Sequence, residues 1–201
     1  MVELARRRVV GSNVSFRIGR FEDVELPAGS FAAAFSATAF HWIDPTIGWA
    51  KVAGLLQPSG VLALLSHTDF SPLDDQFRSA WIEVLPEAAT WERRDRQTLC
   101  EGAEARRGNV SELWAWLTRL ELAREEAAEL FTDVRFTTVA VEQEETAEQL
   151  IAVLRTTSTY LRLDGSSRRR LESGLTAVIK QAGGGFHSTI LAVLVTARVR
   201  A

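Results

Sequence analysis

The stretch from Phe31 to Pro45, FAAAFSATAFHWIDP, decides the fold of this chain. Its first five residues are an almost wholly apolar run of strand length, the pattern of a strand that is covered on both faces of a sheet. Asp44-Pro45 then predicts the start of a helix, because aspartate is a preferred N-cap and proline suits the first helical position. Residues 36–42 are therefore predicted to lie between the carboxyl end of a strand and a helix.

The residues that follow complete a strand-helix-strand unit. Apolar residues recur at helical spacing between Ile47 and Leu56, and Gln57-Pro58-Ser59-Gly60 predicts the end of that helix. Val61 to Leu65 reads as a second buried strand. Two strands joined by one helix are expected to be parallel, with a right-handed crossover.

The rest of the chain alternates between helical and strand patterns, which predicts an α/β layered fold. The helices are expected over 3–10, 73–85, 112–131 (capped by Ser111), 146–156 (with a Thr146/Gln149 capping box) and 166–181, and the strands over 14–18, 136–141 and 188–199. Gly183-Gly184-Gly185 is expected to stop the last helix and not to cradle a phosphate.

Size and composition bound the class of protein. The chain has 201 residues, 46% of them apolar and 24% charged, which fits one globular domain with a hydrophobic core. Its net charge of -3 argues against a nucleic-acid binder, because proteins that neutralise phosphates carry a basic excess. No apolar run approaches the ~20 residues of a membrane helix. Met1 to Ala5 shows no signal peptide, so a cytoplasmic location is expected.

Several kinds of catalytic site are not indicated. His41, His67 and His187 are scattered, and without an HExxH motif or cysteine pairs no metal site is expected. The single cysteine, Cys100, excludes an intramolecular disulfide. Neither a GxSxG nucleophile elbow nor a Walker loop is present.

His41 and Trp42 are the residues with the strongest positional argument for function. Ligands of open parallel sheets bind at the carboxyl ends of the strands, where both residues are predicted to lie. The alternative is that Trp42 is a core aromatic residue and His41 a structural histidine with its hydrogen bonds satisfied. Spacing alone leaves both interpretations open.

The stretch from Phe31 to Pro45 resembles the fourth-strand motif of class I S-adenosylmethionine-dependent methyltransferases of the type-11 and trans-aconitate kind, in which a His-Trp pair follows an apolar strand. Further segments similar to this family occur in the expected order: Gly19 to Asp23, Leu26 to Phe31, Ala53 to Gly60 and, toward the C-terminus, Phe131 to Val134, Leu154 to Ser158, Ala182 to Gly185 and Leu194 to Arg198. The resemblance covers nearly the whole chain.

The resemblance implies a Rossmann-like, three-layer, mostly parallel sheet with an antiparallel last strand. The family's first two strands and its GxGxG turn would precede Met1, so residues 1–201 are expected to form a single partial methyltransferase domain. Residues 68–131 would form a helical cap inserted within it. Glu3 could stand in for the acidic residue at the end of the missing second strand, but residues 4–8 resemble the helix that follows that strand, which argues against this assignment.

Methyl transfer from S-adenosylmethionine to a small-molecule acceptor is the activity that the resemblance implies. Carried over by position, the cofactor would contact Glu22 and Asp23 (adenine) and Ser36 and Ala37 (methionine part), and the acceptor pocket would contain Phe40, His41 and Trp42. Arg20 stands where many relatives have an aspartate. Methyl transfer can proceed by aligning donor and acceptor; a base, if one is used, would be His41, with Asp44 next.

The expected loss of two strands leaves alternatives open. One is a remnant without cofactor that acts as a binding module, and another is an oligomeric partner that borrows a cofactor site. The missing strands would also expose a hydrophobic sheet edge, and exposed edges invite pairing. Either Val14 to Ile18 pairs with Phe31 to Phe35, or another chain covers the edge in a homo-oligomer.

Overall fold

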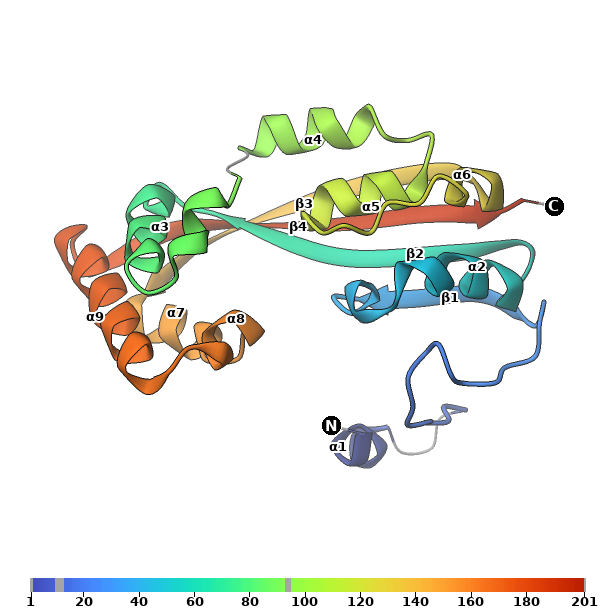
Figure 1. Cartoon of the computed structure of the whole chain (residues 1–201), viewed down its shortest axis with the longest axis horizontal. Coiled ribbons are helices and arrows are strands. Elements are labelled where there is room, and N and C mark those ends of the chain that lie inside the picture. Colours follow the sequence, from blue (N-terminus) through green and yellow to red (C-terminus); the bar gives the residue numbers. More distant parts are fainter. Residues whose placement is uncertain (1, 10–12, 93–94, 201) are drawn as a thin grey trace. The chain divides into compact units, whose positions relative to one another are not determined.

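The structure, a computed structural model of the chain, describes residues 2–9, 13–92 and 95–200 (Figure 1). These residues form two compact units, each built from separate stretches of the chain. Unit 1 consists of residues 1–64, 106–135 and 195–201, and unit 2 of residues 65–105 and 136–194. Three of the four borders between them fall inside strands. The predicted single domain with a cap over residues 68–131 stays a prediction.

Each unit has its own helices, and the longer strands contribute residues to both. Unit 1 holds α1 (Val2–Arg8), β1 (Phe31–Ala37), the 3-10 helix η1 (Phe40–Trp42), α2 (Pro45–Leu55), α5 (Val110–Thr118) and α6 (Ala127–Leu130). Unit 2 holds α3 (Asp74–Ile82), η2 (Pro86–Thr90), α4 (Arg96–Glu104), α7 (Ala147–Leu154), α8 (Ser158–Arg162) and α9 (Gly165–Gln181). The remaining strands are β2 (Leu56–Phe70), β3 (Phe131–Thr146) and β4 (Gly185–Val199).

The strands form a four-stranded mixed sheet in the order β1-β2-β4-β3. β1 and β2 run parallel. Just before they begin, Gly29 and Ser30 donate their N–H groups to the carbonyls of Gly54 and Leu55, so the residue numbers rise in the same direction on both sides. By contrast, Arg200, just past the end of β4, donates its N–H to the carbonyl before the start of β3. The arrows in Figure 1 show β4 running against the other strands. The α/β fold with an antiparallel last strand is confirmed.

Three predictions for the N-terminal part are wrong. Residues 14–18 form no strand, and Val14 and Ile18 are 55% and 79% exposed. Their alternating pattern has no neighbouring strand to pair with, so the predicted pairing with Phe31 to Phe35 is also wrong. β1 is not covered on both faces either, because it lies at the edge of the sheet and Phe35 is 66% exposed. The predicted apolar edge is thus present.

The helix predicted over residues 112–131 is in fact two helices. Asn109, and not Ser111, caps α5 by accepting the N–H of Ser111 (2.9 Å). Arg119 then adopts a left-handed conformation (φ 59°), which ends α5, and α6 begins only at Ala127. The buried Ser111 hydroxyl instead bonds the backbone of Arg124 on both its N–H and its carbonyl, 2.8 Å each, which holds the connection between the helices. An apolar stripe alone does not reveal such a turn.

The core of unit 1 is centred on Trp49 of α2. Its side chain is 1% exposed and lies against Phe40 and Phe131, with ring centroids 4.6 Å and 6.4 Å away. The indole N–H donates to the carbonyl of Leu122 (3.1 Å), so its one polar group is satisfied. These contacts fix α2 against the segment before β3.

Gly48 allows the close approach between η1 and α2. A Cβ atom at this position would lie 2.7 Å from Ile43 Cγ2, closer than the packing allows. We expect Gly48→Ala to lower the free energy of unfolding by about 1–3 kcal/mol, as overpacked cores do. Gly54→Ala is the matched control in the same helix, because nothing lies within 4 Å of its added Cβ. It should raise stability by about 0.5–1 kcal/mol. Urea unfolding of both variants checks this, and equal effects would contradict it.

The core of unit 2 lies between α3 and α9. Leu171 and Leu175 of α9 are buried together with Ala80 of α3, and the added Cβ of Gly174 would come within 3.3 Å of Ala80. The predicted capping box at the start of α7 is confirmed: Gln149 N–H donates to the Thr146 hydroxyl, and the Gln149 side chain accepts the Thr146 N–H.

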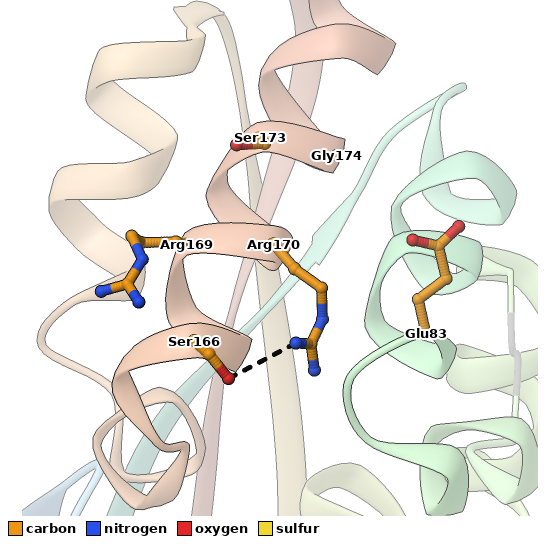
Figure 2. Close-up of a pocket in the computed structure, with 6 residues that line it drawn as sticks. All are labelled: Glu83, Ser166, Arg169, Arg170, Ser173 and Gly174. Carbon is orange, nitrogen blue, oxygen red and sulfur yellow. Dashed lines mark hydrogen bonds between the residues drawn. The ribbon is translucent and has the colours of Figure 1, made fainter.

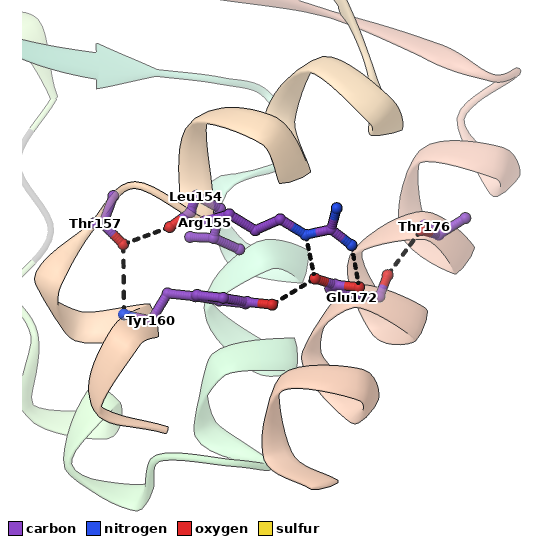
Figure 3. Close-up of polar contacts among 6 residues, drawn as sticks. All are labelled: Leu154, Arg155, Thr157, Tyr160, Glu172 and Thr176. Carbon is purple, nitrogen blue, oxygen red and sulfur yellow. Dashed lines mark hydrogen bonds and ion pairs between the residues drawn. The ribbon is translucent and has the colours of Figure 1, made fainter. Parts of the chain in front are cut away.

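A carboxylate on α9 fastens α7 and α8 to that helix (Figure 3). Glu172 accepts two hydrogen bonds from the guanidinium of Arg155, 2.8 and 2.9 Å long, and a third of 2.5 Å from the hydroxyl of Tyr160. The bond from Arg155 holds the pKa of Glu172 below its ordinary value of 4.5. Its bond to Glu172 also raises the pKa of Tyr160. One acceptor thus satisfies side chains from two helices.

Acid is expected to weaken this fastening. Because the pKa of Glu172 is lower in the folded chain, the unfolded chain binds more protons between the two values. The stability that Glu172 contributes is therefore fully present above pH 4.5. It is lost as the pH falls through the lower pKa that Glu172 has in the folded chain. Thermal melts of Glu172→Gln should show a smaller drop between pH 5 and 3 than those of the parent chain. An identical drop in both would contradict the assignment.

Candidate functional site

The residues predicted to form the site lie at the carboxyl end of β1. Ser36 and Ala37 are the last residues of the strand, Thr38 turns the backbone with a positive φ of 46°, and η1 follows at once. Asp44 then caps α2, with Pro45 in the first turn, as predicted. The sequence therefore placed residues 36–42 correctly at the carboxyl end of the strand, before a helix, although Ser36 and Ala37 belong to the strand itself. Their contacts with a cofactor or an acceptor stay predictions.

His41 and Trp42 lie beside each other in η1. Their ring centroids are 5.0 Å apart, and the indole of Trp42 is 69% exposed. Trp42 is therefore not a core aromatic residue. His41 is half-buried, and burial lowers the pKa of its imidazole from the ordinary value of 6.5. The ring is thus neutral at pH 7, the state in which it can accept a proton.

Phe40 belongs to the core of unit 1. It is 4% exposed, and its ring packs against Trp49. This packing anchors η1 and so positions the two residues that follow it. The predicted contact of Phe40 with a methyl acceptor stays a prediction.

Glu22 and Asp44 are joined at the start of α2. The carboxylate of Glu22 accepts the N–H of Asp44 (2.9 Å), which lowers the pKa of Glu22, and Arg20 lies 3.4 Å away from the same carboxylate. Asp44 accepts the hydroxyl and the N–H of Thr46, and these bonds lower its pKa as well. Both carboxylates therefore serve the helix start. The predicted contact of Glu22 with adenine is not tested by this geometry.

Lys51 is a residue that sequence reasoning missed. From α2 its ammonium donates to the carbonyls of Glu22 and Val24, 2.7 Å each, and it lies 5.5 Å from the ring centre of Phe21. These contacts fasten residues 21–24 to α2. The only signal in the sequence is a lysine among the apolar residues of a helix. Asp23, the neighbouring predicted cofactor residue, is exposed.

Neither a metal cluster nor a membrane helix is found in the part of the chain that the structure describes. Across residues 2–9, 13–92 and 95–200, no group of three or more His, Cys, Asp and Glu side chains is arranged to hold a metal ion. The helices within those ranges are all too short or too polar to cross a bilayer.

Comparison with known protein families finds one match, to the first part of the chain. The family model described as "Methyltransferase domain" matches residues 1–64, the segment that contains every predicted site residue. Residues 1–64 are thus similar to part of a methyltransferase domain. The match ends inside β2, at the same residue as the first stretch of unit 1. No curated protein sequence matches the chain.

One solved structure shows a similarity in fold that extends beyond residue 64. A protein assigned as a type II methyltransferase from Anaeromyxobacter dehalogenans is 16% identical and has a TM-score of 0.55, with 98% of this chain covering 77% of that chain. YcgJ of Bacillus subtilis is also 16% identical, with a TM-score of 0.49, and the match covers 100% of this chain and 76% of that one. At this level of identity the first of these shows the fold alone.

Proposed function

We propose that this chain takes part in the transfer of a methyl group from S-adenosylmethionine to a small-molecule acceptor. The proposal rests on two findings that concern the same residues: the family match and their position at the end of a strand. The segment matched by the methyltransferase family contains a strand, β1, whose carboxyl end presents Ser36, Ala37, His41 and Trp42. That end is where ligands of open α/β sheets bind.

The residues at this end fit part of the cofactor. Ser36 and Ala37 are small, and Ala37 is exposed, so a ligand can approach the backbone closely there. The exposed indole of Trp42 can offer its face to the positive charge of a sulfonium. Of the two acidic residues proposed for adenine, Asp23 is exposed, whereas the Glu22 carboxylate is already bonded to the backbone of Asp44. The fit is therefore better for the methionine part than for adenine.

Within the proposed site, the chain's own residues have two tasks. Trp42 and the end of β1 would hold S-adenosylmethionine and the acceptor, and the bound S-adenosylmethionine would supply the methyl group. The neutral imidazole of His41 takes up the proton that the acceptor releases. Asp44 is the alternative base, but its carboxylate is engaged with Thr46.

Isothermal titration with S-adenosylhomocysteine tests whether a cofactor site exists in this chain. Micromolar binding supports the proposed function. Lack of binding at millimolar concentration rejects it and favours the alternative of a binding module without cofactor.

Trp42→Ala tests whether Trp42 recognises the positive charge of the cofactor or only its shape. The indole face attracts a cation by about 0.5–2 kcal/mol, and only S-adenosylmethionine carries the sulfonium charge. We expect the variant to bind S-adenosylmethionine roughly 2- to 30-fold more weakly, and S-adenosylhomocysteine nearly as well as the parent chain. Paired titrations with the two ligands check this. Equal weakening for both would assign Trp42 a contact that does not depend on charge.

We also propose that a second copy of this chain covers the free edge of β1. The strand contains no charged residue, so two antiparallel copies would bring no like charges together, and its exposed Phe35 would be buried. Light scattering is expected to show a dimer that Ala33→Lys converts to a monomer. Ala152→Lys, an exposed position on α7, is the control. A parent chain that is monomeric at all concentrations, with fast hydrogen exchange at residues 32–35, would reject this proposal.

A further inference from the structure

Two hollows lie along the surface of α9 in unit 2, and they share Arg169 and Ser173. The first is lined by Glu83, Ser166, Arg169, Arg170, Ser173 and Gly174 (Figure 2). The second, of about 560 Å³ and here named the α9 trough, is lined by Ile151, Arg169, Glu172, Ser173, Thr176, Ala177 and Lys180. It is a shallow groove that is open to solvent.

The first hollow is a poor site for an anion. Figure 2 shows Arg170 pointing toward the side of α9 where Glu83 lies, at the end of α3, and that carboxylate would repel a negative ligand. The guanidinium of Arg170 already donates to the hydroxyls of Ser167 (3.0 Å) and Ser166 (3.4 Å). Arg169 leaves the helix on the other side, toward the α9 trough.

The α9 trough combines two unpaired cations with a neutralised carboxylate. Its Arg169 and Lys180 are exposed, and within residues 2–9, 13–92 and 95–200 neither has a carboxylate at ion-pair distance. The one acid that lines the trough, Glu172, is bound by both arms of the Arg155 guanidinium and by Tyr160. The local balance is therefore positive in a chain whose net charge is -3.

Helical spacing arranges the polar groups of the trough in one row. Arg169, Ser173, Thr176 and Lys180 are separated by four, three and four residues, which places them on one face of α9. The first and last are about 16 Å apart along the helix at 1.5 Å per residue. Ala177 and Ile151 provide an apolar part of the lining. The row thus has a cation and a hydroxyl at one end and a second cation at the other end. Between them lie Ala177 and Thr176, whose hydroxyl already donates to the carbonyl of Glu172 (2.7 Å).

We propose that the α9 trough binds a small phosphomonoester with an apolar body. The guanidinium of Arg169 presents a rigid fork of donors that matches phosphate oxygens. It is directed along α9 toward Gly165, 3.7 Å from the Cβ position of that residue, and the Ser173 hydroxyl lies one turn beyond Arg169 in the other direction. The apolar body lies over Ala177 and Ile151, in the direction of Lys180. This site lies wholly within unit 2 and does not depend on the proposed methyl transfer.

Titrations of the whole chain with phenyl phosphate and with inorganic phosphate, followed by amide NMR shifts, test the proposal. We expect saturable shifts in α9 and tighter binding of phenyl phosphate. Arg169→Gln should weaken phenyl phosphate binding about tenfold or more, the effect of a lost hydrogen bond to a charged group. Arg162→Gln, an exposed arginine on α8 outside the trough, is the charge-matched control and should leave affinity unchanged.

Three outcomes overturn the proposal. Equal weakening in Arg169→Gln and Arg162→Gln would mean attraction to net charge and no specific site. Lack of saturation by either phosphate, with the amide spectrum of a folded chain, would mean that the trough holds no phosphate. Tighter binding of an aspartate-rich peptide than of phenyl phosphate would identify an acidic peptide as the ligand class.

Discussion

Trp49→Ala is expected to lower the free energy of unfolding by about 3–5 kcal/mol, the range found when large aromatic residues are removed from cores. Trp49 is 1% exposed, and its ring lies between Phe40 and Phe131. Truncation leaves a cavity between α2 and the start of β3, and it leaves the carbonyl of Leu122 without its indole donor. A cost at the upper end would indicate that the cavity does not collapse.

Two further variants make this expectation specific. Trp49→Phe retains much of the ring contact but not the hydrogen bond, so its cost should be clearly smaller. Trp91→Ala removes the same side chain where it is 39% exposed, and it controls for the loss of a tryptophan as such. Urea unfolding of all three, followed by circular dichroism, gives the comparison. A Trp49→Ala cost no larger than that of Trp91→Ala would place the core of unit 1 elsewhere.

His41→Ala is expected to slow methyl transfer by ~10²–10⁴-fold, the usual contribution of a positioned acid or base. The parent chain is first given S-adenosylmethionine with a labelled methyl group and a panel of small phenols, carboxylates and amines. The variant is then compared on the acceptor that gains label. Its affinity for S-adenosylhomocysteine should be unchanged, because His41 is assigned to the acceptor and not to the cofactor. A panel that gains no label, although the cofactor binds, would count against methyl transfer itself.

The pH profile distinguishes a base from a merely structural histidine. Burial lowers the pKa of His41 below 6.5, so the parent chain should keep its activity at pH 6.5 and lose it as the imidazole becomes protonated at lower pH. His41→Ala should lack this acid limb. Asp44→Asn, which retains a side-chain oxygen as helix cap, tests the alternative base. If Asp44→Asn removes the rate and His41→Ala does not, the base is Asp44.

Features fixed by local chemistry could be predicted from the sequence. The Asp44-Pro45 start of α2 and the Thr146 capping box depend on side chains within three residues of the backbone groups they bond. Gly183 and Gly184 end α9 with positive φ values, a conformation that glycine adopts without strain. The position of residues 36–42 followed from the strand-helix order. The sequence likewise predicted the apolar edge, through the resemblance to the methyltransferase family.

Features that depend on distant partners could not be predicted in the same way. Residues 14–18 have a strand pattern, but a strand needs a neighbour. Ser111 has the right side chain for a cap, but its hydroxyl is bonded to the backbone of Arg124. Phe40 was assigned by its place in a motif, and only the structure shows that Trp49 covers it. In each case the deciding contact comes from another part of the chain.

The borders between the two units fall inside β2, β3 and β4, and this limits which rearrangements of the chain can keep a unit whole. Because unit 1 is assembled from three stretches and unit 2 from two, no single deletion or stop codon isolates either of them. Recombination at one crossover point cannot exchange either unit intact for that of a relative. Grafting either half onto another scaffold would require rejoining several chain ends, so novelty is expected to arise here by point substitution and not by shuffling of modules.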